Sequence, residues 1–96
     1  MNLIIRSLDV SSSRFKKALG KLPDEIKSQA KQALKDLKKN PQPGYLKLEK
    51  LNAYSRPSIY TIHFTGNNSH KMSFEMKSDI AVMRNVGTHK LIDRTP

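Results

Sequence analysis

Residues 80–89 read Ile80-Ala81-Val82-Met83-Arg84-Asn85-Val86-Gly87-Thr88-His89, an apolar segment that breaks at a glycine. Because this segment alternates and is rich in β-branched residues, we expect a strand up to Val86. Arg84 interrupts the apolar pattern. Gly87 can adopt a positive φ or let another backbone approach closely, and Thr88 can cap a short helical turn. The stretch therefore predicts a strand that brings Arg84 and His89 to one edge of a sheet.

Alternation at a period of two predicts three more strands upstream of this one. We expect them at Tyr45–Leu51, Ser58–Phe64 and Lys71–Met76. A loop over 52–57 and turns over 65–68 and 77–79 should separate them, because these segments are rich in turn-forming residues. Short connections between consecutive strands favour an antiparallel meander.

The N-terminal half of the chain predicts one strand and two helices. Leu3–Arg6 is a short apolar run that suits a strand buried on both faces. A short amphipathic helix follows Ser11–Ser13, whose hydroxyls can cap its first turn. A longer helix begins at Pro23, and its apolar residues recur at helical spacing as far as Leu37.

This order of elements predicts an α+β fold in a single domain of residues 1–96. Two N-terminal helices should pack on one face of a small, mostly antiparallel sheet, in the order β-α-α-β-β-β-β. The other face of the sheet should remain open. A chain of this size buries roughly 60 to 65% of its unfolded surface, so we expect a shallow active site.

Charge is the strongest feature of the composition. The chain has 18 Lys and Arg against 8 Asp and Glu, which gives a net charge of +10 on 96 residues. A polyanion is therefore the expected partner, whether a nucleic acid, an anionic membrane or an acidic protein. The chain has no cysteine, and its three histidines lack a metal-binding spacing, so we expect no metal and no cofactor. The apolar runs are too short for a signal peptide or a membrane span, which predicts a cytoplasmic protein with no membrane partner.

The tetrad Val86-Gly87-Thr88-His89, followed by apolar and acidic residues and Arg94, resembles the C-terminal motif of the RelE/ParE superfamily of toxin-antitoxin toxins. It is closer to the Gly-Thr-His subset, which includes the YafQ-like mRNA interferases, than to RelE itself. In the order of its elements the resemblance extends over nearly the whole chain. It implies a RelE-like fold and a functional histidine at His89. Asp93 departs from the YafQ-like enzymes, which have a functional aromatic residue at about this place.

The function implied by the resemblance is that of a toxin of a type II toxin-antitoxin system. Such a protein would be a ribosome-dependent mRNA endoribonuclease that inhibits translation, cleaving without metal by attack of the RNA 2′-hydroxyl. Its partners would be a cognate acidic antitoxin, the ribosome and mRNA. Two other functions stay open: a non-catalytic ParE-like inhibitor of DNA gyrase, and a small basic RNA-binding module.

RNA cleavage without metal needs a base for the 2′-hydroxyl proton, cations for the phosphate charge and an acid for the leaving 5′-oxygen. Histidine suits the proton transfers because its ordinary pKa is near neutrality, and arginine suits the phosphate through its fork of donors. The candidate catalytic residues are His89, Arg84, Arg56, His70 and His63. The residues expected to bind nucleic acid are Lys47, Lys50, Tyr54, Lys71, Lys90 and Arg94.

Each candidate also has a purely structural interpretation. His89 could be an ordinary turn residue, and His63 and His70 could be ordinary residues at strand ends. Arg84 could pair with an acidic residue such as Glu75 in place of a phosphate.

Overall fold

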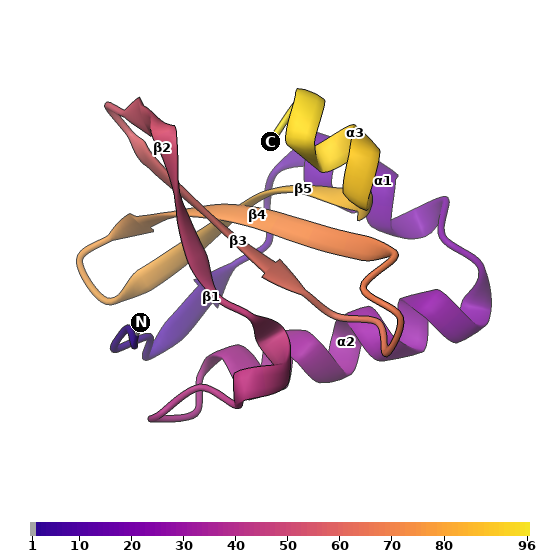
Figure 1. The fold of residues 1–96 in the computed structure, drawn as a ribbon, viewed down its shortest axis with the longest axis horizontal. Helices are drawn as coiled ribbons and strands as arrows, with labels where there is room; N and C mark the ends of the chain where they lie inside the picture. The colour runs from indigo at the N-terminus through magenta and orange to yellow at the C-terminus, as the bar shows by residue number, and fades with distance from the viewer. Residues whose placement is uncertain (1) are drawn as a thin grey trace.

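The computed structural model describes residues 2–96, which form one five-stranded sheet with helices on both sides (Figure 1). The elements in chain order are β1 (Ser7–Asp9), α1 (Ser13–Gly20), α2 (Asp24–Leu37), the 3₁₀ helix η1 (Gly44–Leu46), β2 (Glu49–Ser55), β3 (Ser58–His63), β4 (His70–Lys77), β5 (Ile80–Thr88) and α3 (His89–Arg94).

The sheet has the strand order β1-β5-β4-β3-β2. β2 to β5 are antiparallel neighbours in sequence, and only β1 runs parallel to its neighbour β5. This arrangement confirms the predicted α+β class and the mostly antiparallel sheet. β4 lies at the centre, where it pairs with β3 on one side and β5 on the other.

One face of the sheet forms the hydrophobic core with α1 and α2. Phe15 of α1 and Ala30, Ala33 and Leu37 of α2 are fully buried in this core. The strands contribute a second set of buried side chains, Ile62, Met72, Phe74, Ala81, Met83 and Val86, and Phe64 directly after β3 joins them. The prediction that both N-terminal helices cover one face is confirmed.

Both N-terminal helices start as their sequences predict. Ser12 is the N-cap of α1, and its hydroxyl accepts the backbone N–H of Phe15. α2 begins directly after Pro23, with Asp24 and Glu25 in its first turn, where the helix dipole favours negative charge.

The predicted strand at Leu3–Arg6 is wrong, because the first ladder lies at Ser7–Asp9. Ser7 pairs with Ile80, which is the first residue of β5. The residues before Ser7 therefore have no residue of β5 opposite them. Ile5 is buried in the core and Ile4 is 52% exposed, so the run is not buried on both faces.

The predicted strand at Tyr45–Leu51 begins too early. Residues 44–46 form η1, and Lys47 then adopts a left-handed conformation with φ 47°, which ends that turn and delays β2 to Glu49. β2 continues to Ser55, so most of the segment predicted as a loop over 52–57 is strand, including Tyr54.

A β-bulge changes the side-chain alternation of β5. Ser73 pairs with Asn85 and Phe74 pairs with Met83, so Arg84 is left without a partner in the ladder. Met83 therefore faces the core before the bulge and Val86 faces it afterwards. The break in the apolar pattern of the sequence at Arg84 therefore marks the position of this bulge.

The opposite face of the sheet is only partly open, contrary to the expectation. α3 lies on the side of the sheet away from α2 (Figure 1). Its Ile92 is fully buried, and the amide of Asn85 on β5 donates to the carbonyl oxygen of Thr95 at 2.8 Å. Gly87 permits this close packing, since a Cβ there would lie 2.8 Å from Cδ2 of Leu91.

The end of α2 is joined to η1 through the buried carboxylate of Asp36. The Tyr45 hydroxyl donates to this carboxylate, and Lys39 and Gln32 donate to it at 2.9 and 3.1 Å. These hydrogen bonds, led by that of Tyr45, lower the pKa of Asp36, and burial raises the pKa of Tyr45 to about 12.

We predict that Asp36 adds stability that depends on pH. Its folded pKa lies below the ordinary value of 3.8, so between those two values the unfolded chain binds more protons. The contribution is fully present above about pH 4 and is lost as the pH falls through the folded pKa. Asp36→Asn should lower the free energy of unfolding at pH 7 by about 1–3 kcal/mol. It should also make this free energy less dependent on pH under acidic conditions. Urea melts at a series of pH values would measure both effects. Asp24→Asn on the exposed start of α2 is the control, and an equal loss in both variants would contradict the prediction.

Candidate functional site

Two of the candidate histidines lie side by side on the α3 face of the sheet. The ring centroids of His63 and His89 are 5.3 Å apart, and the ring planes are tilted by 45°. His63 is the last residue of β3, and His89 is the first residue of α3. The fold thus brings together two imidazole side chains, a kind of group that enzymes often use for proton transfer.

Strand register explains why these rings meet. His63 pairs with Lys71 of β4, and Lys71 pairs with Gly87 of β5, so the three residues are level across the sheet. The chain leaves β5 just beyond this level, where Thr88 caps α3 by accepting the backbone N–H of Leu91. The backbone N–H of His89 also donates to the carbonyl oxygen of Ser69 at 2.8 Å, which fixes the start of α3.

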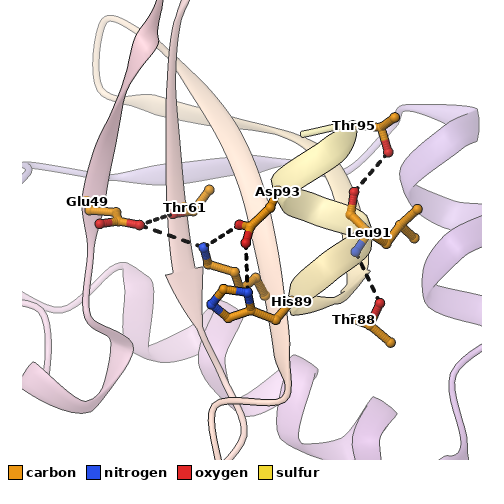
Figure 2. A network of polar contacts seen from close by, with 8 residues as sticks. Glu49, Thr61, Thr88, His89, Leu91, Asp93 and Thr95 are labelled. Carbon is orange, nitrogen blue, oxygen red and sulfur yellow. Dashed lines mark hydrogen bonds and ion pairs between the residues drawn. The ribbon is translucent and has the colours of Figure 1, made fainter.

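A network of polar and charged groups extends from His89 across the sheet to Glu49 (Figure 2). His89 Nδ1 lies 2.8 Å from Oδ2 of Asp93, one helical turn later. The other oxygen of Asp93 accepts from Lys71 Nζ at 2.9 Å. Lys71 Nζ also lies 3.7 Å from the Glu49 carboxylate, which accepts from the Thr61 hydroxyl at 3.5 Å. We name Glu49, Thr61, His63, Lys71, His89 and Asp93 the histidine cluster.

The environment of His63 favours its neutral form. Burial lowers the pKa of His63, and the positive charges of Lys71, His89 and Lys47 lower it further. Its Nδ1 is buried and has no hydrogen-bond partner. The environment of Asp93 favours its charged form, because the hydrogen bond from Lys71 lowers the pKa of this carboxyl group.

His70 lies apart from the histidine cluster. Its Nδ1 lies 2.7 Å from the Ser69 hydroxyl, and its ring packs against Phe64 at 5.9 Å between centroids. Burial lowers its pKa. It lines a cavity of about 460 Å³ between α1 and the start of α3, together with Gly87 and Leu91.

The two candidate arginines are also separate from the histidine cluster. Arg84 lies 3.6 Å from the Glu75 carboxylate, and both line a hollow of about 220 Å³ with Ser12 and Arg14. Arg56 is exposed in the turn between β2 and β3, at the opposite end of β3 from His63. Five strand residues separate that turn from His63, which corresponds to about 16 Å.

The residues expected to bind nucleic acid are spread over four regions. Lys47 follows η1 and is close enough to His63 to lower its pKa. Lys50 and Tyr54 are exposed on the edge strand β2, while Lys90 and Arg94 are exposed on α3. Lys71 is different, because its side chain is only 4% exposed within the histidine cluster.

Sequence reasoning missed three members of the histidine cluster: Glu49, Thr61 and Asp93. For Asp93 a signal existed, since it lies four residues after His89 and such residues share one face of a helix. Glu49 and Thr61 come from neighbouring strands, where they are paired in register. Nothing in their local sequence separates them from ordinary strand residues.

The arrangement can transfer protons at two adjacent points of a substrate. His63 is the candidate base because its pKa is lowered, and His89 has a carboxylate beside it that can stabilise positive charge on its ring. Within residues 2–96, no group of three or more His, Cys, Asp or Glu side chains is placed to hold a metal ion. Among the same residues no helix is long and apolar enough to cross a membrane.

Comparison with known proteins identifies one similar fold. The chain resembles a chain of the RelB-RelE antitoxin-toxin complex from Methanococcus jannaschii, with a TM-score of 0.66 and 24% sequence identity. The match covers 88% of this chain and 96% of that one. No protein-family model matches the chain, and no curated protein matches it. The structural likeness shows that the chain has the RelE-like fold implied by its C-terminal residues.

We predict that His63 titrates below its ordinary pKa of 6.5, because burial and three nearby cations disfavour its charged form. NMR titration of the three histidine rings would measure this directly, with each signal assigned by His→Gln variants. Lys47→Met should move the His63 midpoint upward, since it removes one of those cations. Lys31→Met on the exposed face of α2 is the matched control. A His63 midpoint at or above 6.5 would contradict the predicted environment.

Proposed function

We propose that this protein is an endoribonuclease in which His63 and His89 transfer the protons. The observation that carries the proposal is the contact between their rings, 5.3 Å apart, beside an Asp93 carboxylate that faces His89 Nδ1. Two neighbouring imidazoles can act as base and acid on one phosphodiester that binds beside them.

In the proposed reaction His63 accepts the proton of the RNA 2′-hydroxyl. The 2′-oxygen attacks the adjacent phosphorus, and the bond from phosphorus to the 5′-oxygen breaks. His89 donates its proton to the departing 5′-oxygen while Asp93 stabilises the ring through its Nδ1 contact. The products are a 2′,3′-cyclic phosphate and a 5′-hydroxyl, and the reaction consumes no metal or cofactor.

We infer that the substrate is mRNA bound to the ribosome. The net charge of +10 favours nucleic acid, and the exposed Lys47, Lys50 and Arg56 extend from the histidine cluster to the tip of the β2–β3 hairpin. Tyr54, 40% exposed on the same hairpin, can stack on a base. The site is open, so much of the RNA geometry would have to come from the ribosome.

The proposal assigns supporting roles to four further residues: Arg84, His70, Lys90 and Arg94. Arg84 is separated from the histidine pair, so we assign it to a phosphate farther along the RNA. Lys90 and Arg94 lie on α3 beside His89 and can attract the backbone. His70 lines the neighbouring cavity, where it can support the start of α3.

We further propose that the protein is the toxin of a toxin-antitoxin pair in the cytoplasm. The similar chain belongs to an antitoxin-toxin complex. In this chain the lining of the cavity of about 460 Å³ combines the apolar side chains of Ala18, Leu22 and Leu91 with the basic side chains of Arg14, Lys17 and Lys21. An acidic antitoxin segment with apolar side chains would match both kinds of lining residue.

We expect His63→Ala and His89→Ala each to lower mRNA cleavage by on the order of 10²-fold or more, since each removes one proton transfer. Neither variant should unfold, because His89 is exposed and His63 lies outside the core cluster. Primer extension on translated mRNA would measure the cuts, with circular dichroism and thermal melts to verify folding.

The cleavage assay, together with tests of gyrase inhibition and RNA binding by the parent protein, also separates the other functions. A folded His89→Ala variant that cuts at the parental rate would exclude this residue as acid or base. A parent protein that makes no cuts but inhibits gyrase would favour the ParE-like function. A parent that binds RNA and does neither would favour the RNA-binding module.

We predict that the acidic antitoxin docks over the α1–α3 cavity. Lys17→Glu with Lys21→Glu should weaken the complex by about 10-fold or more, because two attractive contacts become repulsive. Co-purification with the product of the adjacent gene, followed by titration calorimetry, would measure the loss. Lys31→Glu with Lys35→Glu on α2 makes the same change in charge away from the cavity. Equal weakening by both double variants would rule out this docking position.

A further inference from the structure

Lys71 is the one cation of the Lys and Arg type in the histidine cluster, and the proposed reaction gives it no part. It lies on the central strand β4, and its side chain is only 4% exposed. A buried ammonium group is unfavourable unless it is paired and hydrogen-bonded. Lys71 Nζ meets this requirement, because it lies 2.9 Å from the Asp93 carboxylate and 3.7 Å from the Glu49 carboxylate. Its charge is therefore paired with two carboxylates.

We propose that Lys71 is a positioning residue that holds the Asp93 carboxylate against His89 and thereby orients the His89 ring toward RNA. This inference rests on the proposed nuclease function. It assigns Lys71 an action through Asp93 in place of the direct nucleic-acid contact expected from the sequence.

The geometry at Asp93 supports this assignment. Each carboxylate oxygen faces one partner, with Oδ1 2.9 Å from Lys71 Nζ and Oδ2 2.8 Å from His89 Nδ1. The carboxylate therefore joins a side chain of the sheet to a side chain of α3. When Nδ1 donates to Asp93, Nε2 is the nitrogen left to face a substrate.

The His89–Asp93 pair would be weak without Lys71. Both side chains belong to the six-residue helix α3 and are nearly half exposed, at 46% and 47%. An exposed i,i+4 pair favours contact over separation by only about twofold. Lys71 is fixed within the sheet, so its hydrogen bond supplies the constraint that the two exposed side chains lack.

Burial also predicts which kinetic constant Lys71 affects. With 4% of its side chain exposed, Lys71 has almost no surface to offer an RNA phosphate. The other groups around it are Glu49 of β2, Thr61 and His63 of β3, and His89 of α3, with Lys47 nearby. Loss of Lys71 should therefore change the catalytic step and leave RNA binding nearly unchanged.

A double-mutant cycle on cleavage tests the action through Asp93. Lys71→Met should lower kcat by about 10-fold or more with KM within about twofold, because a misplaced acid slows only the chemical step. In an Asp93→Asn background the same change should have a much smaller effect, limited to the loss of the Lys71 charge that lowers the pKa of His63. Lys71→Arg, which keeps a cation, should restore most of the rate. Lys77→Met, at the exposed end of the same strand, is the matched control and should retain parental kcat.

A second measurement requires no cleavage and uses the free protein. In ¹⁵N-edited NMR the His89 Nδ1–H should be visible and protected from exchange in the parent, and it should exchange freely in Lys71→Met and in Asp93→Asn. If Lys71→Met does not fold, Lys71→Gln takes its place in both experiments. Additive losses in the cycle, or an unchanged Nδ1–H signal in the folded variant, would overturn the positioning role. If the parent protein does not cleave RNA, the nuclease proposal fails, and the Nδ1–H signal still decides whether Lys71 holds Asp93 against His89.

Discussion

The pairing of β4 with both β3 and β5 sets the level at which His63, Lys71 and the start of α3 meet. At one level of the sheet, His63, Lys71 and Gly87 lie in register across three strands. Alternation along β4 then sends Met72 and Phe74 into the core and Lys71 to the other face. A slip of one residue would exchange these faces and place a charged lysine in the core, so the register is strongly specified. The same register places Lys71 under Asp93.

Much of the fold was predictable because it depends on local pattern. The long amphipathic helix, the strands at Ser58 and Ile80, and the cap at Thr88 all follow from spacing and propensity. The errors came from long-range constraints: β1 begins where β5 can pair with it, and η1 forms where Tyr45 reaches the buried Asp36. In the site, the Gly-Thr-His residues drew attention to His89. Its contacts with His63 and, through Asp93, with Lys71 depend on register and helix packing that local sequence does not specify.

The proposed chemistry suits a small domain with an open site. The histidine cluster can supply proton transfer, but it lies apart from Arg84 and Arg56, so it offers few groups to fix a bound RNA. Positive charge spread over the surface can attract RNA without choosing its position. A ribosome that already holds mRNA in a defined path would supply the missing geometry. On this view the domain contributes an acid and a base, and the complex that presents the mRNA contributes most of the specificity.

The chemical identity of the RNA ends tests the proposed proton transfer most directly. Translating ribosomes would be incubated with the protein and an mRNA, and both new RNA ends would be characterised. Attack by the 2′-hydroxyl predicts a 2′,3′-cyclic phosphate on the upstream fragment and a 5′-hydroxyl on the downstream fragment. A 3′-hydroxyl with a 5′-phosphate, or intact RNA in every condition where the protein is folded, would contradict a reaction carried by His63 and His89.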